Sequence, residues 1–209
     1  MAFLKYIFQK CLDAKYVHVE NAGDYTVERD GDTLYIFFEC SDGATDWKNN
    51  FDFPAKPYKR MGKTTWFAHR GFLRVWKSIE PYVANHIKDE SVRSICTVGY
   101  SHGAAIAVLC HEYIWFNRPD LRDRIEGYGF GCPRVLWLCR NKRVNCRWDR
   151  FITIRNIDDI VTHVPPACFG FNHVGKMIEI GSRNKYSPID AHRPENILKE
   201  LNNKYTKEG

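Results

Sequence analysis

Five residues near the middle of the chain have the types and spacing of a serine nucleophile. They form the pattern G-x-S-x-G, as Gly99-Tyr-Ser-His-Gly103, between a β-rich run at 94–99 and an apolar run at 103–116. In a strand–turn–helix of this kind the turn lifts the serine off the strand end and needs tiny residues on either side of it. The N–H groups that begin the helix favour a developing oxyanion. The pattern therefore predicts Ser101 as a nucleophile.

A serine hydroxyl needs a base near neutral pH, and the base needs an acid that orients it. Two candidate acids, Asp158 and Asp159, come just after an apolar run at 151–155. The histidines downstream of the serine are His163, His173 and His192. His163 is only four residues from Asp159 and shares its loop, so it is poorly placed to reach Ser101. The residues alone leave both aspartates and the other two histidines open.

Hydrophobic periodicity predicts the elements that must position these groups. Short β-branched or aromatic runs bounded by turn residues predict strands at 16–20, 25–28, 33–38, 65–69, 94–99, 127–131, 151–155 and 174–180. Apolar residues at helical spacing predict helices at 3–12, 72–87, 103–116, 134–148 and 194–205. The stretch from 39 to 64, rich in Asp, Asn, Lys and Pro, is interpreted as irregular. Strands that alternate with helices predict an α/β fold with a mainly parallel sheet and helices on both faces.

Length and composition limit the class of protein. The chain has 209 residues, of which 44% are hydrophobic and 14% aromatic. This is the composition of a globular protein, and the length favours one domain over residues 1–209. The longest small or apolar run, Gly103–Cys110, has eight residues and is far short of the roughly 20 that cross a bilayer. The N-terminal residues lack the apolar core of an export signal, so we expect a cytoplasmic location.

Cysteines and charge favour no metal and no nucleic acid. The eight cysteines contain no C-x-x-C pair, and the seven-residue spacing of Cys132, Cys139 and Cys146 is interrupted by Pro133. We interpret these three as buried structural thiols.

Part of the net charge of +6 comes from one basic stretch, which contains Arg134, Arg140, Lys142, Arg143, Arg147 and Arg150. This stretch either binds an anionic lipid surface or nucleic acid, or is the solvated face of a surface helix, and we favour the helix because no groove-reading motif is present.

Several separated segments, in order, resemble the class 3 lipase family, a group of fungal-type triacylglycerol lipases with an α/β-hydrolase fold. The similarity runs from about residue 33 to 201 and rests on the strand and loop at 34–47, the segment Ala68-His-Arg-Gly-Phe72, the serine motif, Gly129-Phe-Gly-Cys-Pro-Arg-Val135, Asp159-Ile-Val-Thr-His-Val-Pro-Pro166, His173-Val-Gly, and Asp190-Ala-His192. The family's acid is the first Asp of the D-x-V-P-x-L-P-P pattern, and its catalytic histidine precedes the last helix.

The resemblance implies a metal-independent, cofactor-free hydrolase of acyl esters such as acylglycerols. Its catalytic residues would be Ser101, Asp159 and His192, with His173 as a structural residue. Ser41 and the backbone N–H of His102 would form the oxyanion hole. The resemblance also places a lid at 44–53, where only Ala44, Trp47, Phe51 and Phe53 are apolar. We therefore expect preference for short-chain or soluble esters without interfacial activation.

Two residues depart from the family pattern. Glu39 and Cys40 stand where the family usually has Arg and Gly, beside the expected oxyanion donor Ser41. This leaves an alternative in which the chain is an inactive interaction protein that keeps the hydrolase fold. Phospholipase and feruloyl-type esterase activity are further alternatives within the same fold. The oligomeric state is open.

Overall fold

The computed structural model describes residues 2–19, 23–39, 55–60, 63–137 and 145–207. Its centre is a six-stranded sheet in the order β1-β2-β5-β6-β8-β10. The strands are β1 (Tyr25–Asp30), β2 (Thr33–Phe38), β5 (Ser94–Tyr100), β6 (Ile125–Phe130), β8 (Phe151–Asn156) and β10 (Lys176–Ile180). Only β1 is antiparallel to its neighbour, so the sheet is mainly parallel, as predicted.

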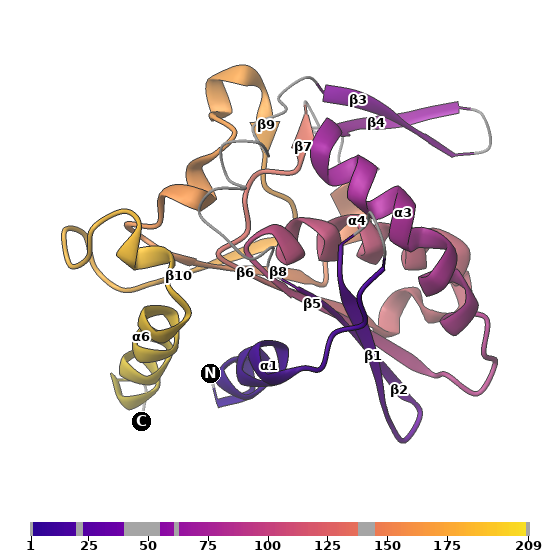
Figure 1. Ribbon diagram of the computed structural model, residues 1–209, viewed down its shortest axis with the longest axis horizontal. Coiled ribbons are helices and arrows are strands. Elements are labelled where there is room, and N and C mark those ends of the chain that lie inside the picture. The colour runs from indigo at the N-terminus through magenta and orange to yellow at the C-terminus, as the bar shows by residue number, and fades with distance from the viewer. Residues whose placement is uncertain (1, 20–22, 40–54, 61–62, 138–144, 208–209) are drawn as a thin grey trace.

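Helices cover both faces of this sheet, which confirms the predicted fold class. Figure 1 shows α3 (Arg70–His86) and α4 (His102–Asn117) above the sheet and α1 (Ala2–Asp13) and α6 (Pro194–Lys207) below it. Every side chain of α4 from His102 to Glu112 is buried, as expected for a helix with apolar residues all round. Among the described helices, none is long and apolar enough to cross a membrane.

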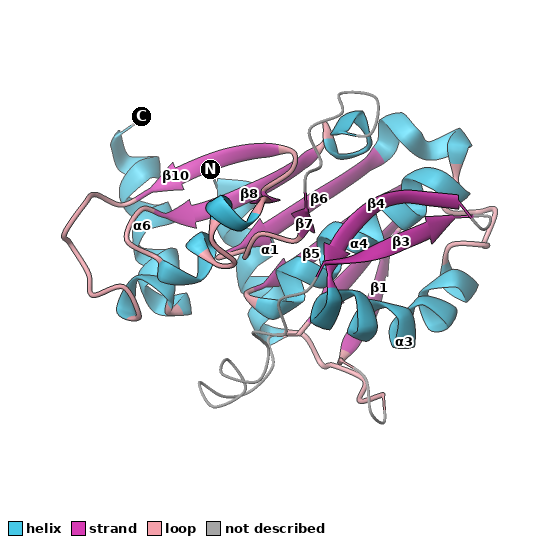
Figure 2. Ribbon diagram, turned by 90° about the horizontal axis from the view of Figure 1, so that it is seen from above, coloured by secondary structure: helices cyan, strands magenta, loops and turns pink. Residues whose placement is uncertain are grey.

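A second, smaller sheet lies on the side of α3 and α4 away from the main sheet (Figure 2). Its antiparallel strands are β3 (Ala55–Arg60), β4 (Lys63–His69), β7 (Leu136–Trp137) and β9 (Phe171–Asn172), in the order β3-β4-β7-β9. Short 3₁₀ helices occupy Pro119–Arg124, Cys146–Trp148, Ile160–His163, Ala167–Phe169 and Asp190–His192. The sequence did not predict β3, because Pro57 is rare inside a strand; here β3 is an edge strand, where proline is tolerated.

One predicted strand is wrong, and one predicted helix is wrong at its start. Residues 16–19 form no strand, since only Val17 makes a bridge, to Tyr25, and the Tyr16 hydroxyl instead bonds to the Cys11 carbonyl at 2.6 Å. The predicted helix at 134–148 is wrong at its start, where residues 136–137 form a short strand. Residues 138–144 lie outside the described residues, Asn145 is helical, and a 3₁₀ turn follows at 146–148. Tertiary bonds hold the start of this segment extended: Arg134 donates to the carbonyls of His163 and Pro165, and Trp137 to that of Phe169.

The basic stretch around 134–150 is therefore not a solvated helix face in its described part. Arg147 is only 15% exposed and pairs with the buried Glu112, and its guanidinium lies over the rings of Trp66 and Trp115. Arg150 pairs with Glu126 at 2.6 Å. These cations contribute to intramolecular contacts. Arg140, Lys142 and Arg143 lie outside the described residues.

Candidate active site

Ser101 sits at a sharp turn where β5 ends and α4 begins. Its backbone angles, φ 56° and ψ −119°, put a non-glycine residue in the left-handed half of conformational space. Such a conformation costs on the order of 1–3 kcal/mol and persists only where the surroundings enforce it. Ser101 N donates to the carbonyl of Phe130 at 2.9 Å, which ties the turn to β6. The strained turn places the side chain beyond the strand end, as the motif predicts.

The two glycines of the motif are required by close backbone contacts. A Cβ on Gly103 would lie 2.2 Å from the carbonyl oxygen of Phe38, at the end of β2. A Cβ on Gly99 would lie 2.3 Å from the backbone of Gly103 itself. Real Cβ atoms do not approach backbone this closely, so no other residue fits without displacing β2, β5 or α4. The glycines thus let the first turn of α4 pack on the strand ends.

Asp159 presents its carboxylate from the loop that follows β8. The residue is fully buried, and its Oδ1 accepts the N–H of Val161 at 2.9 Å. Its backbone carbonyl accepts the Thr162 hydroxyl at 2.8 Å. Oδ2 is left to accept from Nδ1 of His192, at 2.8 Å. The loop therefore directs one carboxylate oxygen toward a histidine 33 residues later in the chain.

Asp158 points elsewhere, although it is the adjacent residue and the same type. Its carboxylate accepts the backbone N–H groups of Asn184, Lys185 and Tyr186 at 3.0–3.3 Å. Burial acts to raise the pKa of Asp158, but these three donors outweigh it and the pKa lies below its ordinary value. Asp158 thus binds the loop that leads to His192.

His192 lies in a single 3₁₀ turn before α6 and completes a chain of hydrogen bonds. Its Nε2 lies 2.8 Å from the Oγ of Ser101. Since the carboxylate of Asp159 can only accept, Nδ1 carries the proton and Nε2 accepts from the serine hydroxyl. The imidazole side chain is 12% exposed, so it is shielded but open to a small reactant. Ser101, His192 and Asp159, predicted from distant parts of the sequence, are brought together at one point.

The other candidate histidines are bound elsewhere. Nε2 of His173 bonds to the Thr162 carbonyl at 2.8 Å, and burial lowers the pKa of His173 to about 4. Burial also lowers the pKa of His163, whose backbone carbonyl accepts from Arg134. His173 therefore supports the loop that carries Asp159, consistent with the structural role that the resemblance implied.

The expected oxyanion donors are only partly described. Ser41, together with Cys40 and the segment 44–53, lies outside the described residues. His102 is the first residue of α4, directly after the serine, and its ring packs edge-on against Phe72 with centroids 5.4 Å apart. His69 stacks on the same Phe72 at 4.2 Å, and burial, with a smaller effect of His102, lowers the pKa of His69 to about 4. The two imidazoles thus line the side of the elbow that faces α3.

Two residues at the site were not singled out from the sequence. Gly131, with φ +56°, follows β6, and a Cβ there would lie 2.8 Å from the ring of His192 and 3.2 Å from the carboxylate of Asp159. Tyr100, the residue before the nucleophile, contacts both the ring and the backbone of His192. Gly131 belongs to the segment 129–135 that carries the family resemblance, which is the signal that could have identified it. Nothing in the local sequence marks Tyr100.

No metal site accompanies the triad in the part of the chain that the structure describes. There, no group of three or more His, Cys, Asp and Glu side chains is placed to hold an ion. Cys132 is buried, and burial raises the pKa of its thiol. Cys146 is exposed, so the interpretation as a buried thiol is wrong there, and Cys139 is not described.

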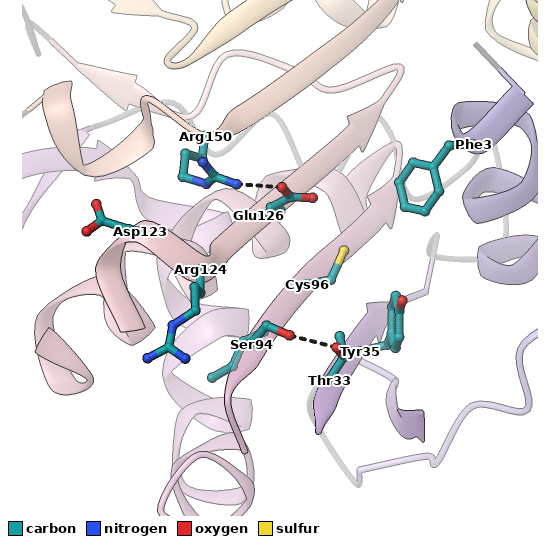
Figure 3. A pocket seen from close by; sticks show the side chains of 10 residues that line it. Phe3, Thr33, Tyr35, Ser94, Cys96, Asp123, Arg124, Glu126 and Arg150 are labelled. Atoms are coloured by element: carbon teal, nitrogen blue, oxygen red, sulfur yellow. Dashed lines mark hydrogen bonds and ion pairs between the residues drawn. The ribbon is translucent and has the colours of Figure 1, made fainter. Parts of the chain in front are cut away.

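A pocket of about 340 Å³ lies where β2 and β5 begin (Figure 3). Thr33 and Ser94, the first residues of β2 and β5, line it and their hydroxyls are 2.6 Å apart. The ion pair of Glu126 and Arg150 borders it. Ser101 follows the other end of β5, where the carboxyl ends of parallel strands present functional groups in folds of this kind. The pocket of Figure 3 is therefore separate from the candidate active site.

Comparison with known proteins gives the same family as the motifs. The family model described as Lipase (class 3) matches residues 35–169, well over half of the chain. The chain belongs to the class 3 lipase family. A lipase from Rhizomucor miehei is 30% identical over 156 residues, which are 69% of this chain and 40% of that protein.

Solved structures of triacylglycerol lipases share the fold. The triacylglyceride lipase of Rhizomucor miehei superposes with a TM-score of 0.68 at 24% identity, over 81% of this chain and 66% of its own. A triacylglycerol lipase described as having a serine protease triad as its catalytic centre gives a TM-score of 0.68 at 26% identity, over 80% of this chain and 66% of its own. The chain thus spans just under two thirds of the length of these structures. The α/β fold with a mainly parallel sheet is confirmed.

Proposed function

We propose that this class 3 lipase is a serine carboxylic-ester hydrolase that acts on lipid esters such as acylglycerols through a Ser-His-Asp triad. One observation carries the proposal: an unbroken hydrogen-bond chain from Ser101 Oγ through His192 to Asp159, with both distances 2.8 Å. The serine protease triad described for the 26% identical triacylglycerol lipase and the match to the class 3 lipase family support it. The resemblance implies no metal or cofactor for this chemistry.

In the proposed reaction Ser101 Oγ attacks the ester carbonyl while Nε2 of His192 takes the hydroxyl proton. The buried carboxylate of Asp159 holds the imidazole in its tautomer and stabilises the imidazolium. When the tetrahedral intermediate collapses, His192 returns the proton to the leaving alcohol and an acyl-enzyme remains. Water then attacks the acyl-enzyme with His192 as base, and the proton returns to Ser101 as the acid leaves.

The oxyanion of the tetrahedral intermediate would be bound at the start of α4. His102 N–H is among the helix N-terminal donors next to Ser101, and this end of the helix dipole favours negative charge. We propose Ser41 as the second donor on the strength of its place in the family motif. Loss of one such donor typically lowers kcat by about 10²–10³.

For substrate choice we propose short-chain or dissolved esters. The support comes from the sequence, because six of the ten residues from 44 to 53 are polar or charged. Interfacial activation needs a broad apolar surface that exchanges protein contacts for lipid. We also propose no nucleic-acid partner, since Arg134, Arg147 and Arg150 of the basic stretch have intramolecular partners. Any contact with a lipid surface would then be weak.

The activity is tested with a fluorophosphonate probe and p-nitrophenyl butyrate on wild type and Ser101→Ala. We expect wild type to label and to hydrolyse the ester, and the variant to lose labelling and at least about 10⁴-fold in kcat. Ser94→Ala, at the other end of β5, is the matched control and should keep both. A wild-type protein that neither labels nor hydrolyses any ester would support the inactive interaction protein instead.

The substrate preference is tested with a series of p-nitrophenyl esters from two to sixteen carbons. We expect kcat/KM to be highest for short chains and the rate to rise smoothly through the solubility limit. Phospholipids and feruloyl esters, assayed in the same series, test the alternative phospholipase and feruloyl-type esterase activities. A steep rise in rate above the solubility limit would overturn the proposed preference while leaving the triad assignment intact.

A further inference from the structure

Tyr100 contacts His192 in two independent ways. Its ring stacks on the imidazole with centroids 5.1 Å apart and an angle of 25° between the planes. Its hydroxyl donates to the backbone carbonyl of His192 at 2.7 Å. One side chain therefore touches both the reactive ring and the main chain of the residue that we propose as the base.

Tyr100 is itself held by burial and by a neighbouring ring. It is the last residue of β5 and is only 8% exposed. The ring of Phe8, from α1, packs edge-on against it at 5.6 Å and 64°. The strained turn at Ser101 comes next in the chain, so the backbone on which Tyr100 sits is the one that holds the nucleophile. A contact from Tyr100 thus fixes His192 relative to Ser101.

His192 needs a contact of this kind because the segment that carries it has little regular secondary structure. It belongs to a three-residue 3₁₀ turn that follows a loop of nine residues after β10, and its N–H bonds to the carbonyl of Ile189 at 3.1 Å. Its two ring nitrogens must meet Ser101 and Asp159 at once, so a rotation of the ring breaks both hydrogen bonds together. Gly131 makes space for the imidazole ring but has no side chain that could restrain it. The stacked ring of Tyr100 restricts that rotation directly.

We propose that Tyr100 is a positioning residue for the reaction, acting through His192. Its ring face holds the imidazole plane in line with both partners, and its hydroxyl holds the main chain from which the imidazole extends. This inference rests on the proposed function, because it assumes that His192 is the base. It adds that the residue before the nucleophile sets the geometry of the base, so that β5 positions both groups.

The test compares Tyr100→Leu and Tyr100→Phe by ester kinetics and by the rate of inactivation with a fluorophosphonate. Tyr100→Leu removes the stacked ring and the hydroxyl; we expect kcat and the inactivation rate to fall about 10²-fold while KM stays within about twofold. Tyr100→Phe keeps the ring and loses one hydrogen bond, so kcat should fall only about two- to tenfold. Recovery of most of the rate by phenylalanine would assign the larger effect to the stacked ring.

Tyr128 provides the matched control. It lies on the same face of the neighbouring strand, is 7% exposed, and donates its hydroxyl to Glu126 at 2.9 Å, away from His192. Tyr128→Leu should lower the melting temperature about as much as Tyr100→Leu and leave kcat unchanged. Should Tyr100→Leu fail to fold, Tyr100→Phe decides, by a lower kcat at constant KM. If the wild type is active, the positioning role is overturned by an unchanged kcat in Tyr100→Phe and in any folded Tyr100→Leu. It is also overturned by a loss of kcat in Tyr128→Leu equal to that in Tyr100→Leu. If the wild type is inactive, the proposed function is overturned as well.

Discussion

The nucleophile and its base are held by two regions of opposite construction. Ser101 stands between a buried strand and a buried helix, in a turn fixed by backbone contacts among Phe38, Gly99 and Gly103. His192 follows a long loop, 181–189, that has little regular structure. Its position depends on distant side chains, which include Tyr100, Asp158 and Asn156, the last of which donates to the Ala191 carbonyl at 3.1 Å.

This difference predicts how the serine turn and the histidine loop respond to substitutions. The elbow is enforced by main-chain contacts that any added atom would break, so it should fail all at once. The histidine loop is held by several separate side-chain bonds, each of modest strength, so it should loosen by degrees. Substitutions in the two regions should therefore differ in whether they affect stability or catalysis first.

The largest expected effect comes from the bond that joins the two regions. In Asp159→Asn, the amide oxygen can still accept from Val161, but the NH₂ group then faces Nδ1 of His192 and favours the wrong tautomer. We expect kcat to fall about 10⁴-fold with little change in the free energy of unfolding. Steady-state kinetics and urea unfolding measure the two quantities. A loss below about tenfold would contradict the role of Asp159.

The elbow should lose stability and activity together in Gly103→Ala. The new methyl group would overlap the carbonyls of Phe38 and Glu39, at 2.2 and 2.5 Å, and β2 cannot move without disturbing the sheet. We expect the free energy of unfolding to fall by about 4 kcal/mol, with loss of fluorophosphonate labelling. The control is Gly31→Ala, where no atom lies within 4 Å and only the left-handed backbone, φ +59°, costs about 1 kcal/mol. Equal losses at the two glycines would refute the packing argument.

These two regions also differ in how far the sequence predicts them. The elbow is visible in its local pattern, because the strand, the glycines and the apolar helix are contiguous. The choice of Asp159 over Asp158, and of His192 over His173, came from family resemblance, since the alternatives differ only in which distant groups they contact. The error at the start of the predicted helix, residues 134–137, has the same cause: carbonyls of the 163–169 segment, far along the chain, bind Arg134 and Trp137 in extended form. Long-range bonds are the part that local periodicity does not encode.

Acid should weaken the helix behind the elbow. His111 of α4 is 1% exposed, and burial lowers its pKa to about 3, whereas an unfolded histidine titrates near 6.5. Below about pH 6.5 His111 is protonated in the unfolded chain but stays neutral in the folded chain. The free energy of unfolding therefore decreases as the pH is lowered, and at pH 4 it is about 3 kcal/mol smaller than at neutral pH. His111→Gln should remove that part of the slope in urea unfolding between pH 7 and 4. An unchanged slope in His111→Gln would contradict the assignment of this acid sensitivity to His111.

The smallest effect should appear in the histidine loop. Asp158→Asn replaces one of the oxygens that accept from the backbone N–H groups of residues 184–186 with an NH₂ group. We expect a fall of about 2–4 °C in melting temperature and a three- to tenfold loss in kcat, because Tyr100 and Asn156 still hold the end of the loop.

Proteolysis distinguishes this loosening from a general loss of stability. Arg183 and Lys185 are exposed trypsin sites within the segment that Asp158 binds. Cleavage there should be several-fold faster in Asp158→Asn than in wild type under conditions where both stay folded. In Gly103→Ala, cleavage at these sites should rise only in step with global unfolding in urea. If Asp158→Asn also digests only in step with global unfolding, the loop and the elbow form one cooperative unit, and the proposed contrast between them is wrong.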